Sequence, residues 1–223
     1  TNMSNMFSGC SSIISLEPLR YWNVKEVINT SSMFSGCSSI LSLSALSEWN
    51  MINVEDCSDM FSHCISLEDI SALNNWNMKN VKNTSNMFLD CISIKSVKTL
   101  NNWSMNNAIA VSAMFAGCTA LENIDGLKDW KIKGEIETRG MFADCISLKN
   151  IDSLLNWDVT NAKDTSEMFL GCIPEIISEK LKSGFLGSFG NKGCVFFEFE
   201  YLGNKSGFCS GHLCAGQKEK IFL

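Results

Sequence analysis

The stretch that decides the fold is MFSGCSSILSLSALSEWNM, residues 33–51, because its pattern returns every 27 residues along most of the chain. The Met-Phe pair that opens it occurs seven times with no insertion between copies. A fixed period of this length is typical of small units that stack and bury their apolar side chains against each other. The pairs are Met6-Phe7, Met33-Phe34, Met60-Phe61, Met87-Phe88, Met114-Phe115, Met141-Phe142 and Met168-Phe169.

Leucine, tryptophan and cysteine keep the same step, which predicts a core built from columns of like residues. Seven of the 11 cysteines belong to the repeat, and we expect them to be free, buried and packed as small apolar groups. Side chains in register point the same way, which is poor geometry for a disulfide, although a disulfide or a metal site stays open. The columns are Leu19, Leu46, Leu73, Leu100, Leu127 and Leu154; Trp22, Trp49, Trp76, Trp103, Trp130 and Trp157; Cys10, Cys37, Cys64, Cys91, Cys118, Cys145 and Cys172.

Within one unit, the spacing of apolar residues predicts a helical turn followed by short strands. Met33, Phe34 and Cys37 have the spacing of one helix face, so we expect a turn at about 31–39 with Ser31 as its N-cap. The apolar residues that follow, from Ile40 to Trp49, are three apart, as in chains that bend inward repeatedly. We expect short strands near 41–46 and 49–54, paired in parallel with those of neighbouring units.

The predicted fold is therefore a leucine-rich-repeat-like repeat solenoid, right-handed, of about six and a half coils over residues 1–173. Each 27-residue coil would hold short parallel strands and one short helical turn. In the fifth and sixth units Ala108 and Glu135 replace the valines found earlier, so Ile109 and Ile136 are candidates for the inward place and the register could shift locally.

Residues 174–223 depart from the repeat and form a glycine- and cysteine-containing tail, expected to be a cap or poorly ordered. Pro174 cannot donate a backbone hydrogen bond. We expect a short helix at 175–183, a strand at 195–202 and a turn at 203–207. Zinc is one reading of the tail, a disulfide another, and a capping hairpin without special chemistry a third, since the paired C-x2-C spacing of structural zinc sites is missing. The candidate ligands are Cys194, Cys209, His212 and Cys214.

Charge and composition argue against nucleic acid and against catalysis. The net charge is −6, and residues 1–78 hold eight acidic and only two basic side chains, whereas phosphate binding needs clustered Lys and Arg. This acidic end is either a solvated surface or a site for a basic partner or a cation. The two histidines, His63 and His212, are far apart, and His63 takes a position held elsewhere by Gly or Asp, which indicates an exposed turn. We expect no enzyme activity and no cofactor.

The candidate binding surface is the band of positions between each repeat leucine and its tryptophan. These positions are polar and vary from unit to unit, which suits hydrogen-bonded contact with a protein or glycan ligand, although solubility alone would also favour them. The residues of the band are Arg20, Tyr21, Glu48, Asn74, Asn75, Asn101, Asn102, Lys128, Asp129 and Asn156.

The combination of M-F-x-x-C and W-N-M in residues 33–51 resembles the repeat of BspA-like leucine-rich surface proteins, in the subgroup common in bacterial lipoproteins and some protists. The resemblance covers about residues 1–173. It implies a cell-surface or secreted adhesion module without catalytic residues. The chain opens at Thr1-Asn2-Met3 inside a repeat, so any membrane contact is expected through an anchor outside it. A structural spacer and an intracellular protein-interaction scaffold are the alternatives.

Overall fold

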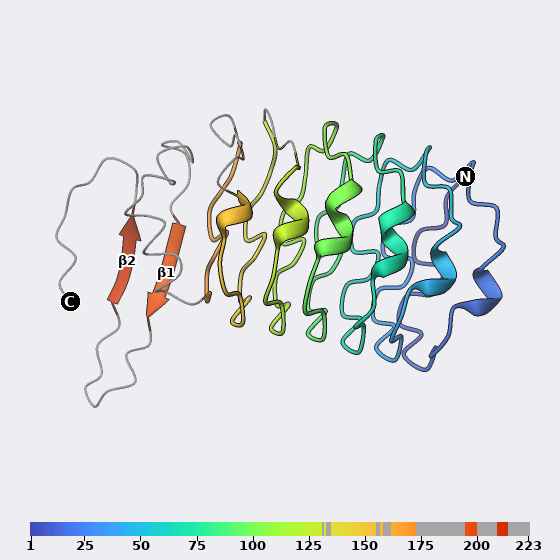
Figure 1. Cartoon of the computed structure of the whole chain (residues 1–223), viewed down its shortest axis with the longest axis horizontal. Coiled ribbons are helices and arrows are strands. Elements are labelled where there is room, and N and C mark those ends of the chain that lie inside the picture. Colours follow the sequence, from blue (N-terminus) through green and yellow to red (C-terminus); the bar gives the residue numbers. More distant parts are fainter. Residues whose placement is uncertain are drawn as a thin grey trace.

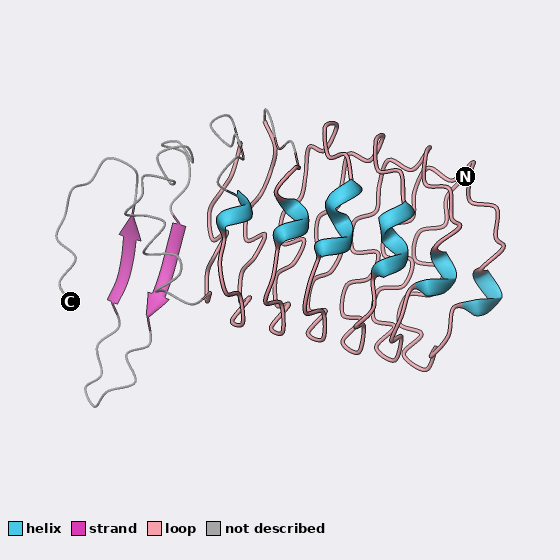
Figure 2. Cartoon of the chain, viewed as in Figure 1, coloured by secondary structure: helices cyan, strands magenta, loops and turns pink. Residues whose placement is uncertain are grey.

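The computed structural model describes residues 1–130, 132, 135–154, 157, 162–172, 195–199 and 209–213. Over its larger part the chain runs through successive 27-residue turns, here called coils, which lie side by side along the long axis (Figure 1). In the described part of the coils, six short 3-10 helices line up in a row on one face, and the other described residues of the coils are loop (Figure 2). They are η1 (Glu17–Leu19), η2 (Ser44–Leu46), η3 (Ser71–Asn75), η4 (Lys98–Asn102), η5 (Asp125–Leu127) and η6 (Asp152–Leu154).

The helices arise from the three-residue spacing of the apolar residues. The Leu46 N–H donates to the Leu43 carbonyl at 2.8 Å, and the Trp49 N–H donates to the Leu46 carbonyl at 3.1 Å. Bonds of this kind give three residues per turn, so every third side chain points to the same inner side. The strands predicted at 41–46 and 49–54 are therefore wrong. Of the former only Ser42 pairs, in one parallel bridge with Asp69.

The helical turn predicted at 31–39 is also wrong, because two residues in this segment have left-handed backbone conformations. Ser32 has φ 54° and Gly36 has φ 74°, and a right-handed helix cannot contain them. The segment instead bonds to the next coil, where Phe34 N–H donates to the Met60 carbonyl at 2.9 Å. Ser31 does not cap a helix, since its own N–H donates to Asn29 Oδ1 at 2.8 Å.

Isolated parallel bridges join the coils with a constant offset of 27 residues. The main ladder runs along one corner of the stack, where the side chain of the bridging residue in most coils also accepts from the N–H two residues on. Pairing between coils thus uses single residues in place of strands. The ladder is Asn2, Asn29, Asp56, Asn83, Ala110, Glu137 and Asp164.

Columns of like side chains fill the interior, as the repeat predicts. The rings of Phe34 and Phe61 stack with centroids 5.7 Å apart and planes within 1°, and those of Trp49 and Trp76 stack at 6.5 Å and 4°. Inner leucines such as Leu73 are fully buried. Each coil thereby supplies one wall of the core of the next, and burial of such rings is the main source of stability.

The irregular fifth and sixth units differ from each other. Ala108 keeps the inward place and Ile109 is 59% exposed, so the predicted exchange does not occur there. In the next unit Ile136 is buried and Glu135 is exposed, as predicted. The bridge from Ala110 to Glu137 keeps the offset of 27, so the irregularity is absorbed locally and the register continues.

In the tail, β1 (Val195–Phe199) pairs antiparallel with β2 (Cys209–Leu213). The strand predicted at 195–202 is confirmed over 195–199. The helix predicted at 175–183 and the turn predicted at 203–207 lie outside the described residues. Among the helices of the described part, none has the length and apolar character required to cross a bilayer.

Candidate functional site

The predicted band follows the row of 3-10 helices, at the point where each helix ends. Tyr21 is 89% exposed, and Arg20 and Asn74 are half-buried. Asn156 lies outside the described residues. The structure therefore places the described members in one surface row, one pair per coil. The exposed members besides Tyr21 are Glu48, Asn75, Asn101, Asn102, Lys128 and Asp129.

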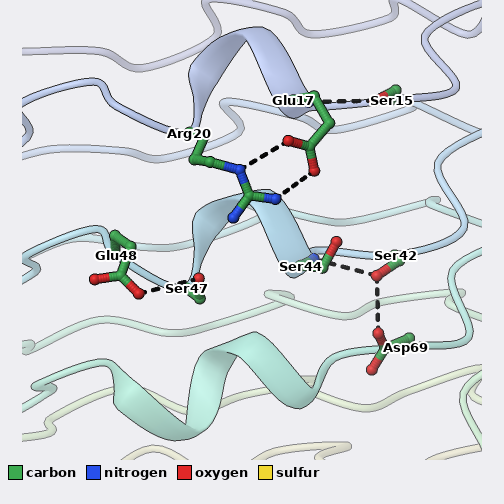
Figure 3. A network of polar contacts seen from close by, with 8 residues as sticks. All are labelled: Ser15, Glu17, Arg20, Ser42, Ser44, Ser47, Glu48 and Asp69. Carbon is green, nitrogen blue, oxygen red and sulfur yellow. Dashed lines mark hydrogen bonds and ion pairs between the residues drawn. The ribbon is translucent and has the colours of Figure 1, made fainter.

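Neighbouring coils make contact within this band. Asn102 Nδ2 donates to Asn74 Oδ1 of the preceding coil at 2.8 Å. At the other end of the row, Arg20 Nε and Nη2 donate to the Glu17 carboxylate at 2.8 and 2.6 Å, and Glu48 lies on the next coil (Figure 3). The hydrogen bond from Arg20 holds the pKa of Glu17 below its ordinary value. Because Glu17 is exposed and Arg20 is only half-buried, water screens this pair and it adds little to the free energy of folding.

A second group in Figure 3 fixes the start of the helices. Ser42 Oγ donates to Asp69 Oδ2 at 2.8 Å. In addition, Asp69 Oδ1 accepts from the Ser71 N–H at 2.9 Å. Burial works against the charged carboxylate, but the hydrogen bonds from Ser71 and Ser42 together lower the pKa of Asp69. One carboxylate of the acidic end is thus used to shape a turn.

Other carboxylates of the acidic end also accept hydrogen bonds within turns. Asp56 Oδ1 accepts from the Ser58 N–H at 2.9 Å. Burial raises the pKa of Asp59, against a hydrogen bond with Asn86 that lowers it. Among the residues with described side chains, no group of three or more His, Cys, Asp or Glu is arranged to hold a metal ion.

A groove of about 450 Å³ that the repeat pattern did not indicate crosses three coils. Three asparagines at the same repeat position, Asn53, Asn80 and Asn107, form one side of its lining, and the lining is completed by Glu55, Lys82 and Ile109. The recurrence of asparagine between two inward residues, such as Met51 and Val54, was the signal that could have found it.

The three asparagines are held in the same way. The Nδ2 groups of Asn53, Asn80 and Asn107 donate to the carbonyls of residues 25, 52 and 79 of the preceding coils, at 2.8, 2.8 and 2.7 Å. Each amide keeps an oxygen and a second N–H that have no partner among the described residues. The groove therefore presents a row of fixed donors and acceptors, one set per coil.

The remaining lining residues balance in charge and add an apolar surface. Lys82 Nζ lies 2.8 Å from Glu55 Oε2, and both side chains are about half exposed. Ile109 is 59% exposed at the end of the same row. The groove thus has no net charge from this pair, with amides along one side and an isoleucine at one end.

The repeat cysteines hold the coils together by a weak hydrogen bond as well as by packing. The thiols of Cys37, Cys64 and Cys91 donate to the carbonyls of Phe7, Phe34 and Phe61, at 3.1 to 3.3 Å. Burial raises the pKa of Cys37 to about 11 and that of Cys64 to about 12. The expected free and buried thiols are confirmed over 37–172, whereas Cys10 is exposed.

The predicted histidine and the predicted zinc ligands of the tail lie apart from the band and the groove or outside the described side chains. His63 is exposed with φ 58°, and its Nδ1 lies 3.2 Å from Asp90 Oδ2, so the predicted turn position is confirmed. The zinc candidates Cys194 and Cys214 lie outside the described residues. Cys209 and His212 lie on β2, which is described by its backbone alone.

Comparison with known proteins gives one family. Searches of curated proteins and of solved structures gave no match. The family described as "Mycoplasma protein of unknown function, DUF285" matches residues 1–124 and 92–174, which together span most of the 223 residues. The chain therefore belongs to this DUF285 family.

Proposed function

We propose that residues 1–173 are a leucine-rich-repeat-like solenoid that acts as a non-enzymatic binding module for a protein or glycan. The observation that carries this proposal is the contrast between the two sides of the coils. Inward positions repeat the same residue type in successive coils, while the exposed band changes from Arg20-Tyr21 to Asn74-Asn75 to Lys128-Asp129. A constant frame that carries a variable surface is the arrangement used by repeat proteins that bind partners.

The chemistry of the cysteines favours a binding role over a catalytic one. A thiol acts as a nucleophile through its thiolate, and burial raises the pKa of Cys57 and of Cys64 to about 12. These thiols remain protonated near neutral pH. The Cys64 thiol donates to the Phe34 carbonyl of the preceding coil, and Cys57 Sγ accepts from the Thr30 hydroxyl.

For location we propose the cell surface or secretion, with any membrane contact through an anchor outside this chain. The BspA-like resemblance of residues 33–51 is the support for this proposal. Labelling of intact cells with a membrane-impermeant biotin reagent, followed by detection of the chain, tests it. Labelling only after lysis would favour an intracellular scaffold.

Binding through the band is tested on an array of purified extracellular proteins and oligosaccharides. The full chain is compared with a variant that carries Glu48→Ala, Asn75→Ala and Asn102→Ala, which change three exposed residues of the band. The control variant carries Glu68→Ala, Lys95→Ala and Lys149→Ala, which change exposed residues of another row. We expect array signals that the band variant loses and the control keeps. The absence of any signal on the array would favour a structural spacer, whereas signals that the band variant keeps would place binding elsewhere on the chain.

A further inference from the structure

The groove across residues 53–109 has the features of a recognition site for a neutral ligand. Its three asparagines are each anchored by one N–H to a backbone carbonyl, so their free oxygens and N–H groups are oriented before a ligand arrives. Preorganised polar groups of this kind lower the entropic cost of binding. An amide that offers a donor and an acceptor side by side matches a hydroxyl group, which also donates and accepts.

Charge argues against an ionic ligand. Lys82 and Glu55 pair within the groove at 2.8 Å, so an anion or a cation would have to compete with a partner already in place. The amides carry no charge. A ligand with many hydroxyl groups and no net charge can bind the amides without breaking the ion pair between Lys82 and Glu55.

The spacing and the apolar end favour a chain of sugars. The asparagines recur once per coil, and paired backbones in parallel ladders lie roughly 4.8 Å apart, which is close to the width of one sugar ring. The exposed Ile109 provides an apolar surface for the C–H face of a ring. Aligned rings could therefore meet one asparagine each and end on the isoleucine.

An extended peptide fits less well, because most backbone N–H and C=O groups beside the groove are already paired with neighbouring coils. Peptides that add to a sheet need unpaired N–H and C=O groups at an edge. Here the N–H groups of Lys82 and Asn83 donate to the Glu55 carbonyl, and those of Ile109 and Ala110 donate to the Lys82 carbonyl. The asparagines occupy further carbonyls.

We propose that the groove lined by Asn53, Asn80, Asn107 and Ile109 binds an uncharged oligosaccharide laid along the stack of coils. The proposal rests on the binding function inferred above and assigns it a ligand class and a place distinct from the band. The Glu55–Lys82 ion pair lines another part of the groove and adds no net charge to it.

The test uses the full chain and neutral hexasaccharides of glucose, mannose and N-acetylglucosamine, with heparin and an uncharged peptide library as the comparison probes. Affinity is measured by titration calorimetry, and ligand-induced shifts of the asparagine side-chain amides are followed by NMR. We expect at least one neutral hexasaccharide to bind with little dependence on salt, since no charge is matched. Its addition should shift the amides of Asn53, Asn80 and Asn107.

The triple variant Asn53→Ala, Asn80→Ala, Asn107→Ala should weaken that binding at least tenfold. The variant Ile109→Thr changes a single exposed side chain, so it reports on the groove even if the triple variant fails to fold, and it should also weaken binding. The control variant Glu68→Ala, Lys95→Ala, Lys149→Ala changes exposed residues of a row outside both the groove and the band, and it should bind as the unmodified chain does.

Three results would overturn the proposal. The first is that only heparin or a peptide binds at the groove residues. The second is that a hexasaccharide binds, but that its affinity falls only in the band variant Glu48→Ala, Asn75→Ala, Asn102→Ala and not in the groove variants. Both leave a binding module with a different ligand or surface. The third is that no probe shifts the groove amides, in which case the array of extracellular proteins decides separately whether the band binds a partner.

Discussion

The indole Nε1 of Trp76 donates a hydrogen bond to the carbonyl oxygen of Leu46, 3.0 Å away and 30 residues earlier in the chain. The same bond joins Trp49 to Leu19 and Trp103 to Leu73, at 3.0 and 2.7 Å. Each tryptophan from Trp49 to Trp157 thus packs in its own coil and also donates to a carbonyl at the end of a 3-10 helix in the coil before. This dual role explains why tryptophan recurs where another large apolar residue would fill the space.

Two substitutions separate the contributions of Trp76. Trp76→Phe keeps a ring in the column but removes one of the two donors to the Leu46 carbonyl, which still accepts from the Trp49 N–H, and should lower the free energy of unfolding by about 0.5–1.5 kcal/mol. Trp76→Ala also removes the ring and should cost about 3–5 kcal/mol. Urea unfolding followed by circular dichroism measures both. An unchanged urea midpoint for Trp76→Ala would contradict the tryptophan column.

Two left-handed positions four residues apart predict substitutions with opposite effects on the free energy of unfolding. Ala113 has φ 52° and is strained there, so Ala113→Gly should stabilise the fold by about 0.5–1 kcal/mol. Gly117 has φ 69°, and a Cβ at this position would meet Asp90 Oδ1. Gly117→Ala should therefore destabilise by more than about 1 kcal/mol. Thermal melts of the two variants, compared with the unmodified chain, are the measurement; equal shifts in the same direction would refute the assignment of strain.

The pH dependence of stability should differ between Asp69 and Asp59. The pKa of Asp69 is lowered in the folded chain, so its stabilising effect is present above the ordinary carboxyl pKa of about 4 and is lost as pH falls through the folded value. Asp69→Asn keeps an acceptor for the Ser71 N–H but no charge. The unmodified chain should be more stable than this variant at neutral pH, and the difference should shrink at low pH.

Asp59 serves as the control of opposite sign. Its pKa is raised, chiefly by burial, so the ionised carboxylate reduces stability once the pH rises through the folded value. Asp59→Asn places at this position the residue found at Asn5 and Asn86, which have the same left-handed backbone. The variant should gain stability at neutral pH and lose that gain in acid. Urea midpoints between about pH 3 and pH 7 record both curves; parallel curves would argue against these shifts.

The buried repeat cysteines, Cys37 to Cys172, should resist thiol reagents in the folded state. Burial raises the pKa of Cys64 and Cys172 to about 12, and roughly a thousandfold less thiolate forms than for a free cysteine. In a background with the three tail cysteines changed to serine, one fast-reacting thiol, the exposed Cys10, is expected at about pH 8. Titration with a chromogenic disulfide before and after urea unfolding provides the count. Rapid reaction of Cys91 in the folded chain would be inconsistent with its burial.

The columns of the interior could be predicted from the sequence because a side chain at a repeat position meets its own equivalent in the next coil. The paths between these columns could not. Met33, Phe34 and Cys37 have helical spacing, yet Ser32 and Gly36 have left-handed backbone conformations. A serine in the sequence does not indicate such a conformation. The glycines at Gly9, Gly36 and Gly117 were a signal for it, partly hidden because His63 and Asp90 take the same place.

The three-residue spacing was visible in the sequence, but its meaning was not recognised. Side chains at Leu43, Leu46 and Trp49 line up because their backbone makes 3-10 turns, for which the period is three. The described residues of the band lie at the surface, as predicted. The leucine before them and the tryptophan after them point inward, so the chain between the two faces solvent. The groove was missed, because the direction of the Asn80 side chain depends on a carbonyl of the preceding coil.

The constant offset of the bridges has a consequence for how such genes change. Since the ladder joins residue to residue at intervals of 27, removal of one whole unit, such as residues 82–108, brings together two surfaces that already fit. Unequal recombination between repeats would therefore yield shorter or longer proteins that still fold. The row from Asn53 to Asn107 would lose or gain one amide whenever the unit involved contains one of these asparagines, and the length of the groove would vary among descendants without any new fold having to evolve.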